Sequence, residues 1–85
     1  MFIPSIEPVP LKMNDHGVVL VSGTRVSIDT IIGAFNDGAT PQDIARSYDS
    51  VPLADIFAVI AYYLHHKDEV DAYLAQRQRE QKLSP

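Results

Sequence analysis

The sequence predicts a small α+β protein, mainly helical, in which an N-terminal β-hairpin leads into a helix-turn-helix unit of three to four helices. Three observations point to this fold. A valine-rich stretch at 18–21 follows turn-forming residues, a Gly-Ala-Thr-Pro sequence at 38–41 separates two short apolar repeats, and Pro52 precedes a long apolar segment. Strand, capped helix, glycine stop, second capped helix and third helix follow in the order that a helix-turn-helix requires.

The hairpin is predicted from residues 11–13 and 18–21, which flank Asn14-Asp15-His16-Gly17. These four residue types tolerate the dihedral angles of a tight turn. Residues 1–10 contain three prolines and are expected to form an extended arm, because proline removes a backbone donor and interrupts helices. We therefore place one domain at residues 11–78.

The first helix is expected after Ser27 or Asp29, either of which could cap it, and Asn36-Asp37-Gly38 should end it. Isoleucine and phenylalanine recur along this segment with the period of one helix face. Thr40 followed by Pro41 predicts the start of a second helix, with a capping hydroxyl and a proline at the first helical position.

The third helix is predicted from Leu53 to about residue 65, and it is apolar on both sides. A helix that is apolar all round is normally buried all round, which a domain of this size cannot achieve alone. We therefore expect a homodimer, with the seam formed by Ala58, Val59, Ala61 and Tyr62. The pattern slips near Lys67, which indicates a kink or a new helix, and residues 79–85 are expected to form a frayed tail.

Composition narrows the classes of function. The chain has 85 residues, no cysteine and a formal net charge of −4. Thiolate metal sites are excluded, and the sequence contains neither a nucleophile motif nor a phosphate-binding glycine loop, so we expect no enzyme, no cofactor and no metal. His65 and His66 are adjacent and would point apart on a helix. Without a signal peptide or a membrane span, a cytoplasmic protein is expected.

Nucleic-acid binding is disfavoured by the negative charge, because affinity for DNA comes mainly from lysine and arginine. The start of the third helix has no side chain suited to reading bases, and Asp55 would repel phosphate. Two interpretations stay open: the fold serves protein association, or another element contacts DNA. The candidate DNA contacts are Lys12, Arg25, Gln42 and Arg46.

Three segments together resemble the domain of unknown function 433 family, whose members are regarded as VapB-like antitoxins. They are Gly23-Thr24-Arg25-Val26-Ser27-Ile28-Asp29, Gly38-Ala39-Thr40-Pro41-Gln42-Asp43-Ile44 and the alanine-rich stretch 53–63, and the resemblance spans residues 11–74. It implies a winged or homeodomain-like helix-turn-helix, encoded beside a PIN-like ribonuclease toxin that the antitoxin binds and silences. Such an antitoxin would also be a candidate to bind its own operator.

Gly23, Thr24 and Arg25 are the family motif. Thr24 is expected to bond locally and Gly23 to permit the backbone path. Arg25 has two interpretations, since a guanidinium makes bidentate contacts with carboxylates and with phosphates. It could tie the strand end to Asp29, Asp43 or Asp49, which we favour, or it could contact phosphate.

Arg77 and Arg79 are the candidate toxin contacts, because an inserted arginine could compete with the metal that carboxylates hold in a PIN-like active site. The alternative, which we favour for these two residues, is a solvated helix end whose charge suits the helix dipole. For the whole chain, the main hypothesis is an antitoxin-like component of a toxin-antitoxin pair. The alternatives are a helix-turn-helix transcriptional regulator without a toxin, and a dimeric scaffold for another partner.

Overall fold

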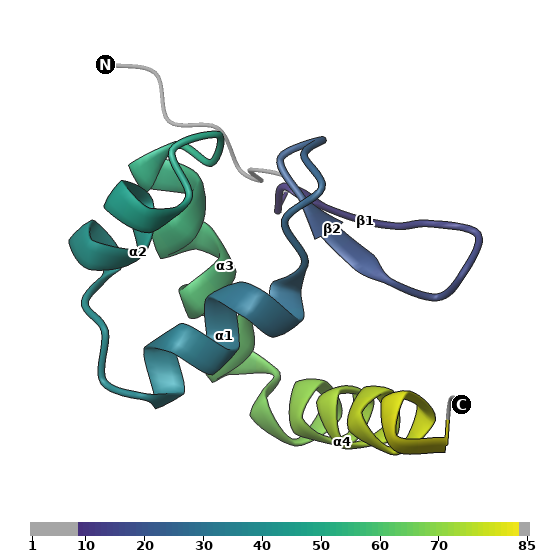
Figure 1. The fold of residues 1–85 in the computed structure, drawn as a ribbon. Helices are drawn as coiled ribbons and strands as arrows, with labels where there is room; N and C mark the ends of the chain where they lie inside the picture. Colours follow the sequence, from purple (N-terminus) through teal and green to yellow (C-terminus); the bar gives the residue numbers. More distant parts are fainter. Residues whose placement is uncertain (1–8, 84–85) are drawn as a thin grey trace.

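A computed structural model describes residues 9–83, so residues 1–8 of the predicted arm lie outside the described residues. Strands β1 (Leu11–Met13) and β2 (Val19–Val21) form an antiparallel hairpin in which Leu11 pairs with Val21. Four helices follow: α1 (Ile28–Asn36), α2 (Pro41–Ser47), α3 (Leu53–His65) and α4 (Lys67–Leu83). The predicted α+β, mainly helical fold is confirmed, with the hairpin beside the α1–α3 unit and α4 leading away from it (Figure 1).

α1 and α2 each begin after a residue whose side chain caps the helix. The Ser27 hydroxyl accepts a hydrogen bond from the backbone N–H of Thr30 at the start of α1. At α2 the Thr40 hydroxyl accepts from the N–H of Asp43, whose carboxylate accepts from the N–H of Thr40. This reciprocal capping box satisfies two amide groups that the helix itself leaves free. The two predicted helix starts, at Ser27 and Thr40, are therefore confirmed.

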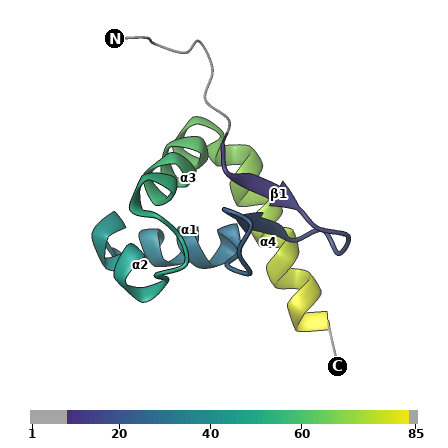
Figure 2. The same cartoon turned by 90° about the horizontal axis from the view of Figure 1, so that it is seen from above.

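The core lies where α3 packs against α1 and α2. Seen from above, these three helices surround it, while the hairpin lies on the side of α4 (Figure 2). α1 contributes Ile28, Ile31 and Ile32, and α2 contributes Ile44. The buried side chains of α3 are Ile56, Val59, Ile60 and Tyr63. Val21 of the hairpin, Val51 of the segment between α2 and α3, and Val70 of α4 are also buried in the core.

A polar contact between α3 and α4 fixes the angle at their junction. α3 ends at His65 and α4 begins at Lys67, which confirms the predicted new helix. The Tyr63 hydroxyl and the Lys67 ammonium donate to the two carboxylate oxygens of Asp71 at 2.7 and 2.8 Å. The hydrogen bond from Lys67, followed by that from Tyr63, lowers the pKa of Asp71 below the usual aspartate value. α4 then continues to Leu83, so residues 79–83, which were expected to belong to a frayed tail, are helical.

Candidate functional site

The family motif builds the turn between β2 and α1. Ser22 and Gly23 both have positive φ, 57° and 68°, and the N–H of Thr24 donates to the carbonyl of Val21 at 2.9 Å. Two positive φ values in succession occur in the primed turns that suit strand twist, and glycine adopts them without strain. The Thr24 hydroxyl donates to the Val21 carbonyl and accepts from the N–H of Val26. The local roles predicted for Gly23 and Thr24 are confirmed.

Arg25 does not tie the hairpin to the helices. Its side chain is exposed and makes no hydrogen bond or ion pair with any described residue. Two of its three expected partners are engaged elsewhere, Asp29 with Arg77 and Asp43 with Arg46. The interpretation that we favoured for Arg25 is therefore wrong in this structure.

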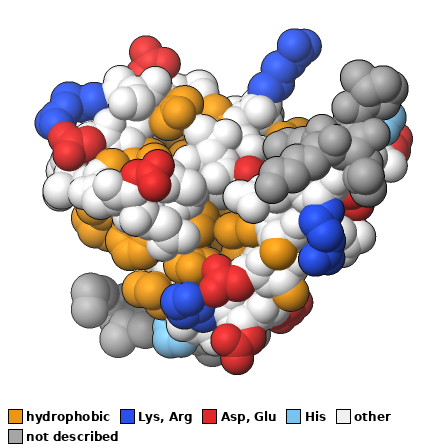
Figure 3. Space-filling model, turned by 60° about the horizontal axis from the view of Figure 1, so that its bottom comes forward, with side chains coloured by type: hydrophobic (Ala, Val, Ile, Leu, Met, Phe, Trp, Pro, Cys, Tyr) orange, Lys and Arg blue, Asp and Glu red, His pale blue; other side chains and the backbone are white. Residues whose placement is uncertain are grey.

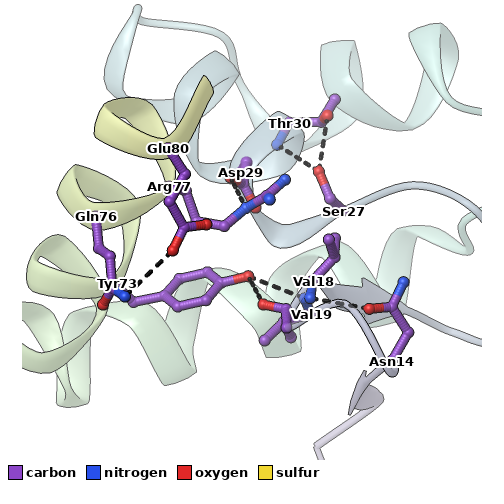
Figure 4. A network of polar contacts seen from close by, with 11 residues as sticks. Asn14, Val18, Val19, Ser27, Asp29, Thr30, Tyr73, Gln76, Arg77 and Glu80 are labelled. Carbon is purple, nitrogen blue, oxygen red and sulfur yellow. Dashed lines mark hydrogen bonds and ion pairs between the residues drawn. The ribbon is translucent and has the colours of Figure 1, made fainter. Parts of the chain in front are cut away.

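Arg77 forms an ion pair that attaches α4 to α1. Its Nε donates to Oδ2 of Asp29 at 3.1 Å, and the two side chains are 18% and 23% exposed. Asp29 lies in the first turn of α1, so this pair attaches α4 to the start of α1 (Figure 4). The interpretation of Arg77 as part of a solvated helix end is therefore wrong in this structure. Arg79 is exposed and makes no hydrogen bond or ion pair with a described residue.

Tyr73 makes a second attachment that the sequence did not predict. Its hydroxyl accepts from the N–H of Val19 at 3.0 Å and donates to the carbonyl of Gly17 at 2.9 Å. α4 therefore holds the hairpin at the point where β2 begins (Figure 4). Alternation in β2 could not reveal this contact, because the partners are 54 and 56 residues apart in the chain.

α3 leaves three of its large apolar side chains exposed. Leu53, Phe57 and Leu64 are 40%, 48% and 57% exposed, although their helical period is that of a core face. Of the four residues predicted for a dimer seam, Val59 is fully buried within the chain, Ala58 and Tyr62 are half-buried, and Ala61 is exposed. Val59 cannot contact a second copy, so it is withdrawn from the predicted seam.

The candidate DNA contacts do not form one surface. Lys12 and Arg25 belong to the hairpin and its turn, while Gln42 and Arg46 lie on α2. Both ribbon views place α2 and the hairpin on opposite sides of the molecule (Figures 1 and 2). All four side chains are exposed, and Arg46 is paired with Asp43. On the face drawn in Figure 3, lysine and arginine are isolated and mixed with acidic side chains.

Two further features bear on ligands and membranes. Within residues 9–83, no group of three or more histidine, aspartate or glutamate side chains is placed to hold a metal ion. His65 and His66 are exposed, and the ring of His66 packs on Tyr62 with 4.4 Å between centroids. No helix in the described part of the chain is long and apolar enough to span a bilayer.

An apolar groove of about 270 Å³ lies between β1 and the first turns of α4. Met13, Glu69, Val70 and Tyr73 are among its lining residues. The groove adjoins the Tyr73 contact to the hairpin. A partner that entered it would therefore touch both elements.

Comparison with known proteins identifies the family. The model of the family described as "Protein of unknown function (DUF433)" matches residues 15–63, which run from the hairpin turn to Tyr63 in α3. The match is shorter at both ends than the predicted resemblance over residues 11–74, and it leaves α4 outside. Neither the curated proteins nor the solved structures gave a match. More than half of the chain is matched, and the chain therefore belongs to the DUF433 family.

Proposed function

We propose that this chain is an antitoxin-like protein that binds and inhibits a PIN-like ribonuclease toxin. The observation that carries the proposal is the solvent-facing side of α3, the helix that would read bases in a DNA-binding helix-turn-helix. That side presents Leu53, Phe57 and Leu64 where polar donors and acceptors would be needed. Large exposed apolar side chains grouped on one helix are typical of protein interfaces.

Charge supports protein association in the same way. The chain carries a formal net charge of −4. Two of its exposed cations are neutralised by neighbours on the same helix, Arg46 by Asp43 and Lys67 by Asp71. Non-specific DNA affinity requires several lysine or arginine side chains that contact phosphates together. The order of the helices therefore agrees with the alternative of a transcriptional regulator without a toxin. The charge of their exposed side chains does not.

Arg79 is the side chain that we assign to the toxin. It projects from α4 without a described partner, whereas Arg77 is held by Asp29. A PIN-like active site gathers carboxylates around a divalent metal, and a free guanidinium can form bidentate hydrogen bonds with such carboxylates. In this proposal α4 delivers Arg79 while the contacts of Tyr73 and Arg77 keep α4 in place.

The experiment is co-expression of this chain with the product of the neighbouring gene, followed by tandem purification and a ribonuclease assay. Co-purification with suppressed ribonuclease activity is the expected result. Arg79→Met should weaken suppression at least tenfold, and the matched control Arg46→Met, which changes an arginine already paired on α2, should leave it unchanged. A chain that ignores its neighbour and binds the upstream promoter, with affinity that falls steeply with salt, would establish the regulator instead.

A further inference from the structure

The exposed side of α3 has a regular arrangement of large and small residues. Ala54, Phe57, Ala61 and Leu64 follow one another at intervals of three, four and three residues. This is the spacing of the a and d positions along the seam of two packed helices. Ala54 and Ala61 are exposed, Phe57 is 48% exposed and Leu64 57% exposed, so the whole seam faces solvent in the single chain.

The residues along this seam are small, large, small and large in turn, and their positions are symmetric about residue 59. If two copies of α3 pack antiparallel around that point, Phe57 of one copy meets Ala61 of the other, and Leu64 meets Ala54. Every large side chain then faces a small one. A parallel pair would instead set Phe57 against Phe57 and alanine against alanine, with a crowded layer next to a gap.

We propose that the partner on this face is a second copy of the same chain, bound through an antiparallel α3–α3 seam with Phe57 on Ala61. This proposal goes beyond toxin binding: it assigns the exposed face of α3, with Phe57 and Leu64, to the second copy, and the toxin contact then rests on α4. It leaves α4 and Arg79 outside the seam. It also replaces the seam predicted from the sequence, because Val59 belongs to the core and Phe57 and Leu64 take its place.

Electrostatics permit this arrangement. The only charged side chain between Leu53 and Leu64 is Asp55, and its carboxylate accepts a hydrogen bond of 2.6 Å from the Ser22 hydroxyl of the same chain. No side chain caps the start of α3 at Pro52. In an antiparallel pair, this partially positive end lies beside the partially negative end of the partner's helix, so the two dipoles attract.

The seam is short, and we therefore expect a weak dimer with a dissociation constant in the micromolar range. Sedimentation velocity over a concentration series on the full chain measures it directly. Phe57→Glu should abolish the dimer while the monomer remains folded, because Phe57 is not part of the core. A wild-type chain that stays monomeric at millimolar concentration would overturn the proposal.

A size exchange tests the register. Phe57→Ala leaves alanine facing alanine, and Ala61→Phe sets phenylalanine against phenylalanine, so each variant alone should dimerise at least tenfold more weakly than the wild type. Mixing the two variants restores one large and one small residue in both central layers. Native mass spectrometry of an equimolar mixture should therefore show a larger share of heterodimers than random pairing gives.

The matched control is Ala72→Phe, which adds the same bulk at an exposed position on α4 and should leave the dimer unchanged. An Ala61→Phe chain that dimerises as well as the wild type, or a mixture with no preference for heterodimers, would refute the antiparallel seam. Toxin binding is measured separately by co-purification. A monomeric Phe57→Glu chain that still suppresses the ribonuclease would show that the two proposals stand on different surfaces.

Discussion

The Tyr73 hydroxyl is the most direct test of how α4 is attached to the rest of the fold. Tyr73→Phe removes a single oxygen atom and keeps the ring in place. The N–H of Val19 loses its acceptor and the carbonyl of Gly17 loses its donor, at 3.0 and 2.9 Å. These two hydrogen bonds are only half-buried, so we take the lower part of the usual range, about 0.5 to 1 kcal/mol for each, and expect a total loss of about 1 to 2 kcal/mol in the free energy of unfolding.

For a domain of this size, that loss corresponds to a fall of roughly 4 to 16 °C in the melting temperature. Thermal unfolding followed by circular dichroism, at one fixed protein concentration, measures the change. Tyr48→Phe is the control, because the Tyr48 hydroxyl makes no hydrogen bond with a described residue. If the two variants melted within about 2 °C of each other, the attachment of the hairpin by Tyr73 would be refuted.

Three further substitutions test other contacts that stabilise the fold. Arg77→Met should lower the free energy of unfolding by about 1.5 to 3 kcal/mol, since it leaves the Asp29 carboxylate half-buried and unpaired, whereas Arg79→Met should leave urea unfolding curves unchanged. Val59→Ala should cost about 2 to 3 kcal/mol in the same assay through lost burial and a cavity in the core. The lowered pKa of Asp71 means that its contribution to stability is present at neutral pH and is lost as the pH falls through its folded-state pKa. Asp71→Asn should therefore be less stable than the wild type at pH 7, and the difference should vanish in acid; a constant difference down to about pH 2 would contradict the assignment.

Local signals in the sequence were sufficient for the secondary structure. The turn residues before β2, the Ser27 and Thr40 caps and the break near Lys67 each act within a few residues, and the structure contains all of them. Such signals depend on backbone dihedral angles and on hydrogen bonds between near neighbours. They are independent of how the helices later pack.

Contacts between residues far apart in the chain could not be predicted from such local signals. Arg77 and Asp29 are 48 residues apart, and their pairing depends on the angle between α3 and α4, which no periodicity specifies.

The buried side of α3 could not be predicted for a different reason. Because it is apolar all round, its spacing is compatible with more than one buried stripe, and the stripe through Ile56, Val59 and Tyr63 is the one that packs against α1 and α2. The apolar side chains of α3 that lie outside this buried stripe are the ones that remain exposed.

The position of the family match separates two parts of the molecule. Residues 15–63 contain the Gly23 turn, α1, α2, most of α3 and all of the proposed α3 seam except Leu64. α4, with Arg79, lies beyond the match. It is nevertheless held to the matched part by three contacts, through Asp71, Tyr73 and Arg77. A dimer built on α3 would therefore carry two copies of α4, each fixed in direction by these contacts. In such an arrangement the matched segment determines how the copies associate, and the helix that follows it determines which partner each copy can hold.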